Sequence, residues 1–521
     1  MKTLISLIFT VALLAGCATG VKQHEKLQTL VKDGKFEDGL ALVNSKDFYP
    51  DKNSELLKLL ELGTLHYYNG NYFQAVTTFN QAQELSEKLF TVSMSKKALS
   101  AVTNDSLDNY YGEKYERSLI RLFQILSHLA LSESNKYEAY KLVEKNEKGE
   151  TKTKNVTAVT LDDTKRRFHL NASRSVLIEW NSLLNSYKAT SGGNATYKDD
   201  LLAKLFGAFI HERLGTQNDL QIAKNLYIEA KNVLFKNYNI YRTYNAKNKE
   251  FNKKYDELHL MPEQDVKNNY TAETQSFKEL AKYIDERIET FGSVNKHNVF
   301  FMISKGFVSP KVANKFDFPI PTDKIPASIP AGGNFVGFAA KVLKAGEGAL
   351  PKIYFELPQI NYEPSQDSYT IVVNDKNGKV IFEKSTALVE PVSDVAYQAL
   401  DEKSFENTAK VGARVAGKHL SALAASYLLY EKQKGKSEML AFMAASGAYA
   451  AANKGIEMSE RADLRYWATL PSDFRLSSGS LPPGEYTVSL VKKDKEKNTL
   501  ISNSKFQVKE KANKIVTLIA I

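Results

Sequence analysis

The stretch LGTLHYYNGNYFQAVTTFNQA, residues 62–82, decides the fold of the N-terminal half of this chain. Apolar and aromatic residues recur three and four apart on both sides of Asn69-Gly70-Asn71, which is the pattern of two helices joined by a tight turn. Small residues on facing helices let the backbones approach closely, and large aromatic residues fill the space beside them. We therefore expect a helical hairpin. Its packing residues would be Gly63, Gly70, Tyr72, Ala75, Phe79 and Ala82.

This spacing resembles that of the tetratricopeptide repeat, in which two antiparallel helices recur every 34 residues or so. A partial copy precedes it at Gly34, Phe36, Gly39 and Val43, and another follows at Ala223, Tyr227 and Ala230. Prolines are almost absent up to about residue 290. The sequence therefore predicts a tetratricopeptide-like α-helical repeat domain over residues 17–292, with Lys145 to Asn155 as a polar loop within it.

The pattern changes near Asn298. Short apolar runs typical of strands occur at 299–303, 335–342, 353–357 and 369–373, and again in the last 40 residues. Asn377-Gly378 predicts a hairpin turn, since both residues tolerate positive φ. We expect a β-sandwich-like domain made of residues 293–391 and 469–521, which gives an α+β multidomain fold.

An alanine-rich helical hairpin, residues 392–468, is expected as an insertion into that domain. Its small residues recur at helical spacing, so we expect one row to face the other across the hairpin, with Gly435 in the turn. The first row is Ala413, Gly417, Ser421, Ala424 and Ala425, and the second is Ala441, Ala444, Ala445, Ala448 and Ala451.

The N-terminus has the order of an export signal: Lys2, an apolar core from Leu4 to Leu14, and small residues after it. Leu14-Ala15-Gly16-Cys17 is typical of a bacterial lipoprotein, with residues 1–16 as the signal peptide, cleavage after Gly16 and lipid on Cys17. Because Ala18 and not an aspartate follows, we expect the outer membrane, on its periplasmic side. Cys17 is the only cysteine, so its lipidation would exclude disulfides and thiol chemistry.

Composition argues against several activities. The net charge is +10, but basic and acidic residues alternate, as in 144–148, and nucleic-acid binders usually cluster their charge on one face. The eight histidines are scattered, and His211-Glu212 lacks a second histidine one helical turn away. We therefore expect no enzyme activity, no metal, no cofactor and no nucleic-acid partner.

Asp463, Arg465 and Trp467 alternate on a short stretch, which would place all three on one side. Two interpretations are open. They form a polar clasp for a glycan or peptide, with Trp467 as its platform, or a salt-bridged junction between the hairpin and the sandwich, with Trp467 buried.

Several motifs together resemble an uncharacterised family of bacterial tetratricopeptide-repeat-like lipoproteins with a mixed C-terminal region. These motifs are Tyr111–Arg117 (YGEKYER), Asp394-Val395-Ala396, the helix around Arg414, and Ala462–Pro471 (ADLRYWATLP). The resemblance implies the architecture and the membrane address and supplies no catalytic residue. Members of this family look like neighbours of lipoproteins that activate penicillin-binding proteins.

The sequence thus predicts a lipid-anchored, non-enzymatic adaptor or scaffold of an envelope assembly, whose helical repeats bind envelope proteins. A link to peptidoglycan synthesis is what the resemblance implies. The alternatives are a periplasmic glycan-binding protein and a component of a ring-shaped envelope or export complex.

Overall fold

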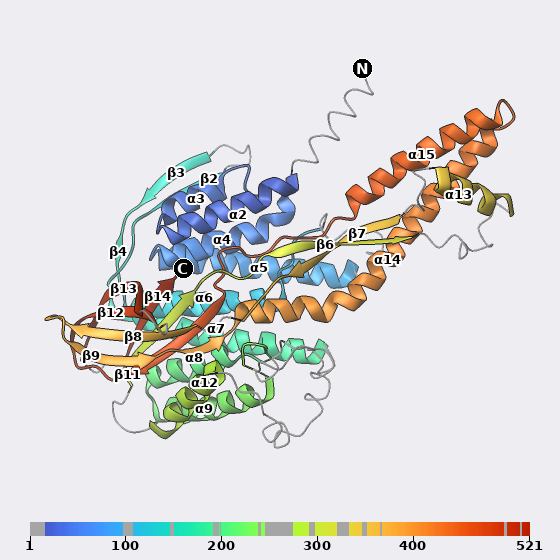
Figure 1. The fold of residues 1–521 in the computed structure, drawn as a ribbon. Coiled ribbons are helices and arrows are strands. Elements are labelled where there is room, and N and C mark those ends of the chain that lie inside the picture. The colour runs from blue at the N-terminus through green and yellow to red at the C-terminus, as the bar shows by residue number, and fades with distance from the viewer. Residues whose placement is uncertain are drawn as a thin grey trace.

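The computed structural model combines helices with several small β-sheets, which confirms the predicted α+β class (Figure 1). The residues that the structure describes are 16–96, 108–145, 151–190, 197, 199–237, 241–244, 275–290, 297–319, 333–345, 352–364, 367–493, 498–510 and 513–521.

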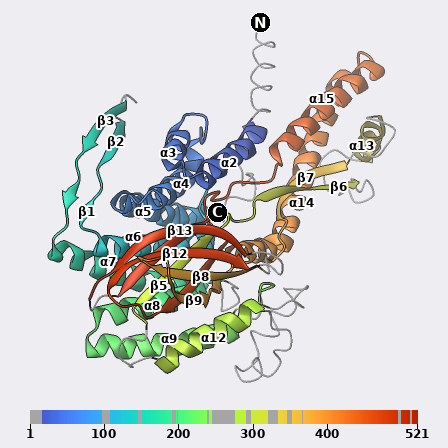
Figure 2. The same ribbon diagram turned by 60° about the vertical axis from the view of Figure 1, so that its left-hand side comes forward.

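Helices make up most of the described N-terminal half, and successive helices from α2 to α9 lie against each other, as Figures 1 and 2 show. Their bounds are α2 Gly16–Lys32, α3 Phe36–Asn44, α4 Glu55–Tyr68, α5 Tyr72–Lys96, α6 Lys114–Glu133, α7 Asp163–Thr190, α8 Leu201–Leu214, α9 Gln217–Asn237 and α12 Gln275–Thr290, with the short 3-10 helix Lys52–Ser54 before α4. Their inward side chains belong to one large apolar cluster that also includes residues of the C-terminal half.

The quoted stretch forms the hairpin of α4 and α5. A Cβ atom on Gly63 would lie 2.8 Å from the ring of Phe79, so only glycine permits this approach of the two helices. Gly70 turns the chain with a φ of 76°, and Ala75, Phe79 and Ala82 are completely buried. The ring of Tyr72 packs against Tyr67 with 5.7 Å between centroids.

Two four-stranded sheets lie in the C-terminal half. The first has the order β10-β11-β5-β14 and is antiparallel except for the parallel pair β5–β14; the second has the order β13-β12-β8-β9 and is antiparallel throughout. The strands of the first are β5 Val299–Lys305, β10 Ala387–Glu390, β11 Asp473–Gly479 and β14 Lys514–Ala520, and those of the second are β8 Ser368–Asp375, β9 Val380–Ser385, β12 Gly484–Lys493 and β13 Asn498–Val508.

The first sheet is covered on both faces, which explains why 299–303 is an unbroken apolar run. Side chains alternate between the faces of a strand. Val299, Phe301 and Ile303 share an apolar cluster with the second sheet, whereas Phe300 and Met302 belong to the cluster of the helices. The first sheet therefore lies between the helices and the second sheet. The expected turn at Asn377-Gly378 is confirmed: it joins β8 to β9, and Gly378 has a φ of 81°.

Shorter strands pair in twos: β1 Lys136–Tyr137 with β4 Val159–Thr160, β2 Tyr140–Lys145 with β3 Thr151–Val156, and β6 Lys311–Pro319 with β7 Lys352–Ile360. The expected loop at Lys145 to Asn155 is therefore wrong for Lys145, which ends β2, and for residues 151–155, which lie in β3; residues 146–150 lie outside the described residues. Alternating threonines favour a strand there, and pairing with β2 supplies backbone hydrogen bonds.

The alanine-rich region forms α14 Val392–Gln433 and α15 Glu438–Ser459, with Gly435 in the turn as expected. The start of α14 belongs to the large cluster through Val392, Val395 and Ala396. The C-terminal half of α14 and the whole of α15 project from the rest of the protein as an elongated arm, with α13 Gly333–Ala345 beside them (Figures 1 and 2).

Residues 335–342, expected as a strand, lie in the helix α13, so that prediction was wrong. Phe335, Phe338, Ala339, Val342 and Leu343 follow the three- and four-residue spacing of a helix, and all of them are buried against α14 and α15. The helical spacing is present in the sequence, although prolines precede it and strand-like runs flank it.

The expected pairing of small residues across the hairpin was also wrong. Ala441 and Ala445 are buried, but Ala413, Gly417, Ser421, Ala444, Ala448 and Ala451 are exposed. Larger side chains form the contacts instead: Leu423 and Tyr427 meet Tyr449 and α13, and Val411 and Val415 meet Ile456 and β7. They remove more apolar surface from water than alanine can.

Candidate functional site

Asp463, Arg465 and Trp467 lie in an irregular segment, residues 463–470, that runs against α4 and α6. Its backbone is held by carboxylates of those helices. Glu61 of α4 accepts from the backbone N–H groups of Ala468 at 2.7 Å and Thr469 at 3.0 Å, and Glu116 of α6 accepts from that of Trp467 at 3.2 Å. The helical layer therefore already binds an extended segment of its own chain.

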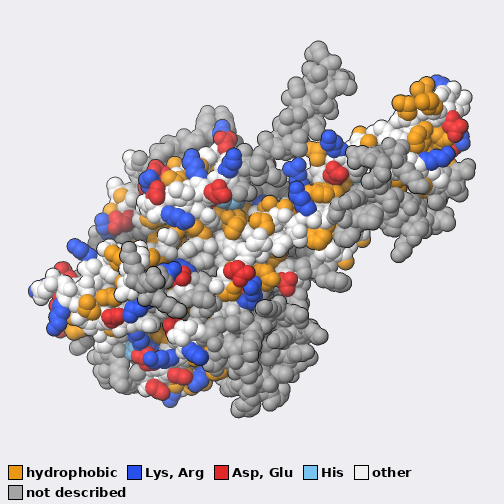
Figure 3. Space-filling view, in the orientation of Figure 1, with side chains coloured by type: hydrophobic (Ala, Val, Ile, Leu, Met, Phe, Trp, Pro, Cys, Tyr) orange, Lys and Arg blue, Asp and Glu red, His pale blue; other side chains and the backbone are white. Residues whose placement is uncertain are grey.

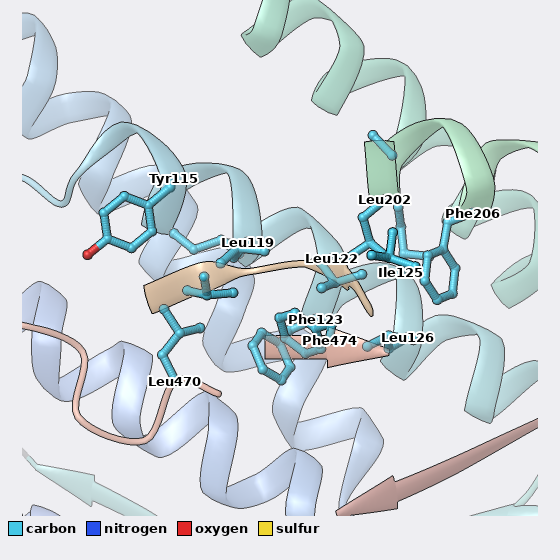
Figure 4. Packing of buried hydrophobic residues seen from close by; sticks show 14 of the residues in the cluster. Tyr115, Leu119, Leu122, Phe123, Ile125, Leu126, Leu202, Phe206, Leu470 and Phe474 are labelled. Atoms are coloured by element: carbon cyan, nitrogen blue, oxygen red, sulfur yellow. The ribbon is translucent and has the colours of Figure 1, made fainter. Parts of the chain in front are cut away.

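Trp467 is completely buried. Its indole Nε1 donates to the Thr64 hydroxyl at 3.0 Å, and its ring lies 5.5 Å from Phe123 and 6.0 Å from Phe79 between centroids. Figure 4 shows how Leu470 and Phe474 continue this contact along α6. A buried indole has no face to offer a sugar ring, so the position of Trp467 fits the junction interpretation and not the glycan platform.

Asp463 and Arg465 pair with each other. The guanidinium donates to the two carboxylate oxygens at 2.8 and 2.7 Å, and also to the backbone carbonyls of Asn53 at 3.3 Å and Asp108 at 3.0 Å. These contacts fix the segment to the 3-10 helix before α4 and to the chain before α6. The ion pair that could have anchored a ligand is thus engaged within the protein.

The carboxylates that hold the segment were missed by sequence reasoning. Glu61 is fully buried, and its burial raises its pKa to about 7, against the opposing effect of the hydrogen bonds from Thr469 and Ala468. Burial likewise raises the pKa of Glu116, which also forms a capping box with Glu113 at the start of α6. Their partners lie some 350 to 400 residues away in sequence, so no local pattern could have indicated them.

A polar cavity of about 160 Å³ lies where the helices meet the first sheet. Thr243, Tyr362, Ser393 and Asp473 contribute polar groups to its lining. Asp394 beside it accepts from the backbone N–H and the hydroxyl of Thr243 at 2.7 and 2.9 Å, and its burial raises its pKa to about 6. The carboxylate of Asp473 accepts a hydrogen bond from Nε of Arg475 at 2.9 Å. The two carboxylates are thus engaged in internal contacts.

The arm carries two distinct surfaces. We call the first the shaft face; it consists of exposed small residues, namely Ala413, Gly417 and Ser421 of α14 and Ala444, Gly447, Ala448 and Ala451 of α15. Apart from chain neighbours and the backbone of the same helix, no atom of the described residues lies within 4 Å of an ideal Cβ on Gly417 or Gly447. The packing of the described residues therefore requires glycine at neither position.

We call the second surface the apolar tip. It consists of four large side chains near the turn, of which Leu428 is 67% exposed, Met439 75%, Leu440 67% and Met443 59%. Figure 3 shows apolar side chains gathered at this end of the arm with charged ones between them.

Gly16 and Cys17 lie in the first turn of α2, and their side chains are outside the described residues. Among the described helices, none is both long and apolar enough to cross a membrane. The described residues also contain no group of three or more His, Cys, Asp or Glu placed to hold a metal ion. The imidazole Nδ1 of His211 forms a hydrogen bond with the Asp219 carboxylate at 2.7 Å.

Comparisons with protein-family models, with curated proteins and with solved structures found no match to this chain.

Proposed function

We propose that the chain is a lipoprotein anchored through Cys17 in the outer membrane, facing the periplasm, and that it acts as a non-enzymatic adaptor or scaffold of an envelope assembly. The pattern from Lys2 to Cys17 supports the anchor. A link to peptidoglycan synthesis rests on the resemblance of its motifs to the lipoprotein family described above.

In this proposal the helices are tetratricopeptide-like repeats and the two sheets form a β-sandwich-like domain. The close contact of Gly63 with Phe79 supports the repeat, as does the complete burial of Ala223 and Ala230 in α9. The apolar cluster shared by β5 and β8 supports the sandwich.

The shaft face is the surface that we assign to the partner. The side of α4 and α6 that a repeat could have offered is covered by the 463–470 segment. Glycine inside a helix costs about 1 kcal/mol relative to alanine, yet Gly417 and Gly447 have open space where a Cβ would lie. This observation carries the proposal, because a partner packed closely on this face would account for both glycines.

In-cell photo-crosslinking tests this assignment. A photoreactive amino acid replaces Ala444 on the shaft face, and a control chain carries it at the exposed Lys376 in the β8–β9 turn, far from the arm in Figure 1. We expect an adduct of defined mass at position 444 that is absent at position 376. The same yield at both positions, or none at position 444, would contradict the assignment.

The ring-shaped complex remains a second candidate, because small exposed residues on two helices also suit contacts between identical copies. The mass of the adduct distinguishes a different partner protein from a second copy of the chain. An adduct of twice the mass of the mature chain, which begins at Cys17, indicates a second copy, and any other mass indicates a different protein.

A further inference from the structure

The apolar tip is the densest group of exposed large apolar side chains in the part of the chain that the structure describes. Leu428, Met439, Leu440 and Met443 are all at least 59% exposed and lie within eight residues of the bend at Gly435. Exposed apolar groups of this size usually mark contact with a membrane or a partner.

The charge around the tip is basic. Residues 407–456, which form the outer part of the arm, contain seven Lys or Arg and two Glu. Of these, Arg414 and Lys418 pair with Glu460, and Lys434 pairs with Glu431 at the turn. Lys432, Lys434 and Lys436 are exposed beside the apolar side chains. This combination of apolar side chains and flanking lysines suits an anionic lipid surface, where the lysine stems extend to the headgroups.

The face behind the tip carries no opposing charge. From Met439 to Asn453 the sequence has no charged residue, and on α14 no acidic residue occurs between Glu406 and Glu431. The acidic residues nearest the tip are Glu431 and Glu438, at the turn itself. Glu431 pairs with Lys434, and Glu438 accepts a hydrogen bond from Tyr430, so with Lys432, Lys434 and Lys436 the turn keeps a net charge of +1.

The direction of the arm agrees with a membrane contact. Figures 1 and 2 show the N-terminal end of α2 and the turn between α14 and α15 at the same, upper end of the molecule. Because α2 begins beside Cys17, lipid attached there would hold the protein with this end toward the bilayer.

We propose that the apolar tip inserts Leu428, Met439, Leu440 and Met443 into the surface of a phospholipid bilayer with anionic headgroups, as a second membrane contact beside the lipid on Cys17. This inference rests on the proposed lipid anchor at Cys17, because the anchor is what would bring the tip to a membrane in the cell. A second contact fixes the orientation of the shaft face relative to the membrane, which a single lipidated residue on a helix end cannot do.

The test uses the chain from residue 17 onward with Cys17→Ser, so that tip insertion is measured without lipid. This substitution removes the only cysteine, so Met443→Cys creates a unique site for an environment-sensitive fluorophore. The matched control carries Lys376→Cys. The probe surface is vesicles of phosphatidylethanolamine and phosphatidylglycerol, compared with vesicles of phosphatidylcholine.

We expect a blue shift of the fluorophore at position 443 on the anionic vesicles and none at position 376. Leu440→Asp should lower the vesicle-bound fraction at least about tenfold, because a charged side chain resists insertion. Circular dichroism checks that Leu440→Asp keeps its helices, which we expect because Leu440 is 67% exposed.

Three results would overturn the inference: no shift at position 443, equal shifts at both positions, or a dimer in lipid-free buffer that Leu440→Asp dissociates. The last would assign the tip to a second copy of the chain. Failure of the lipid anchor is a separate result, since it appears as loss of palmitate labelling in cells and leaves the vesicle measurement unchanged.

Discussion

Replacing Gly63 by alanine should destabilise the protein, although alanine is the better helix former. Its Cβ would lie 2.8, 2.8 and 2.9 Å from three atoms of the Phe79 ring, which real Cβ contacts do not tolerate. The ring has little room to move, because it stacks on Phe123 at 5.3 Å and lies 6.0 Å from Trp467. Overpacking of this kind costs about 1–3 kcal/mol, and helix propensity returns about 1 kcal/mol. With the ring enclosed on several sides, we expect a net loss of about 1–2 kcal/mol.

Urea denaturation followed by far-UV circular dichroism measures this loss. Gly447→Ala is the matched control, since it makes the same substitution inside a helix where the new Cβ meets no described atom of another element within 4 Å. It should stabilise the arm by about 0.5–1 kcal/mol. Phe79→Leu should relieve part of the cost of Gly63→Ala in the double variant. The reasoning is refuted if Gly63→Ala and Gly447→Ala change stability equally, or if Gly63→Ala is as stable as the parent.

Three further predictions concern Trp467, Glu61 and Cys17. Trp467→Ala should lower the unfolding free energy by about 3–5 kcal/mol, since the buried ring and its bond to Thr64 are both lost; a loss below about 1 kcal/mol in urea denaturation would speak against the buried position. Burial raises the pKa of Glu61 from 4.5 in the unfolded chain to about 7 in the folded chain, so between these pH values the folded state binds the proton more tightly. The stability of the parent relative to Glu61→Gln should therefore fall by about 3 kcal/mol as the pH rises from 4.5 to 7. A stability difference that does not change with pH contradicts this. Cys17→Ser should abolish incorporation of a palmitate analogue in cells and release the protein from the membrane fraction; unchanged labelling would exclude Cys17 as the anchor.

The parts of the fold that depend on local contacts could be predicted from the sequence. Gly63 and Phe79 lie in one helical hairpin, so their spacing alone indicated their contact. Asn377-Gly378 indicated its turn for the same reason, because a two-residue connection and positive φ depend on neighbouring residues only.

Contacts between distant segments could not be predicted in the same way. Nothing near Glu61 indicates that it accepts hydrogen bonds from Ala468 and Thr469, because the two segments meet only when the C-terminal half folds onto α4. The choice between a clasp and a junction for Trp467 depended on that same long-range contact.

The arm shows a second kind of information that the sequence pattern does not contain. Helical spacing identified its two rows of small residues, but spacing does not say which face of each helix is buried. Val415 and Leu423 are larger than Ala413 and Ser421 and take the buried side, which leaves the small residues exposed. The feature on which the proposed function rests therefore became visible only in the structure.

The most direct test of the adaptor proposal is a comparison of envelope proteins that co-purify from cells with tagged parent chain and with tagged Gly447→Leu. Gly447 is exposed and a Cβ atom there meets no described atom within 4 Å, so we expect the leucine to leave the fold intact and to project from the shaft face. We predict that at least one envelope protein is recovered with the parent and lost with the variant. The same set of proteins with both chains, or no specific protein with the parent, would contradict the proposal.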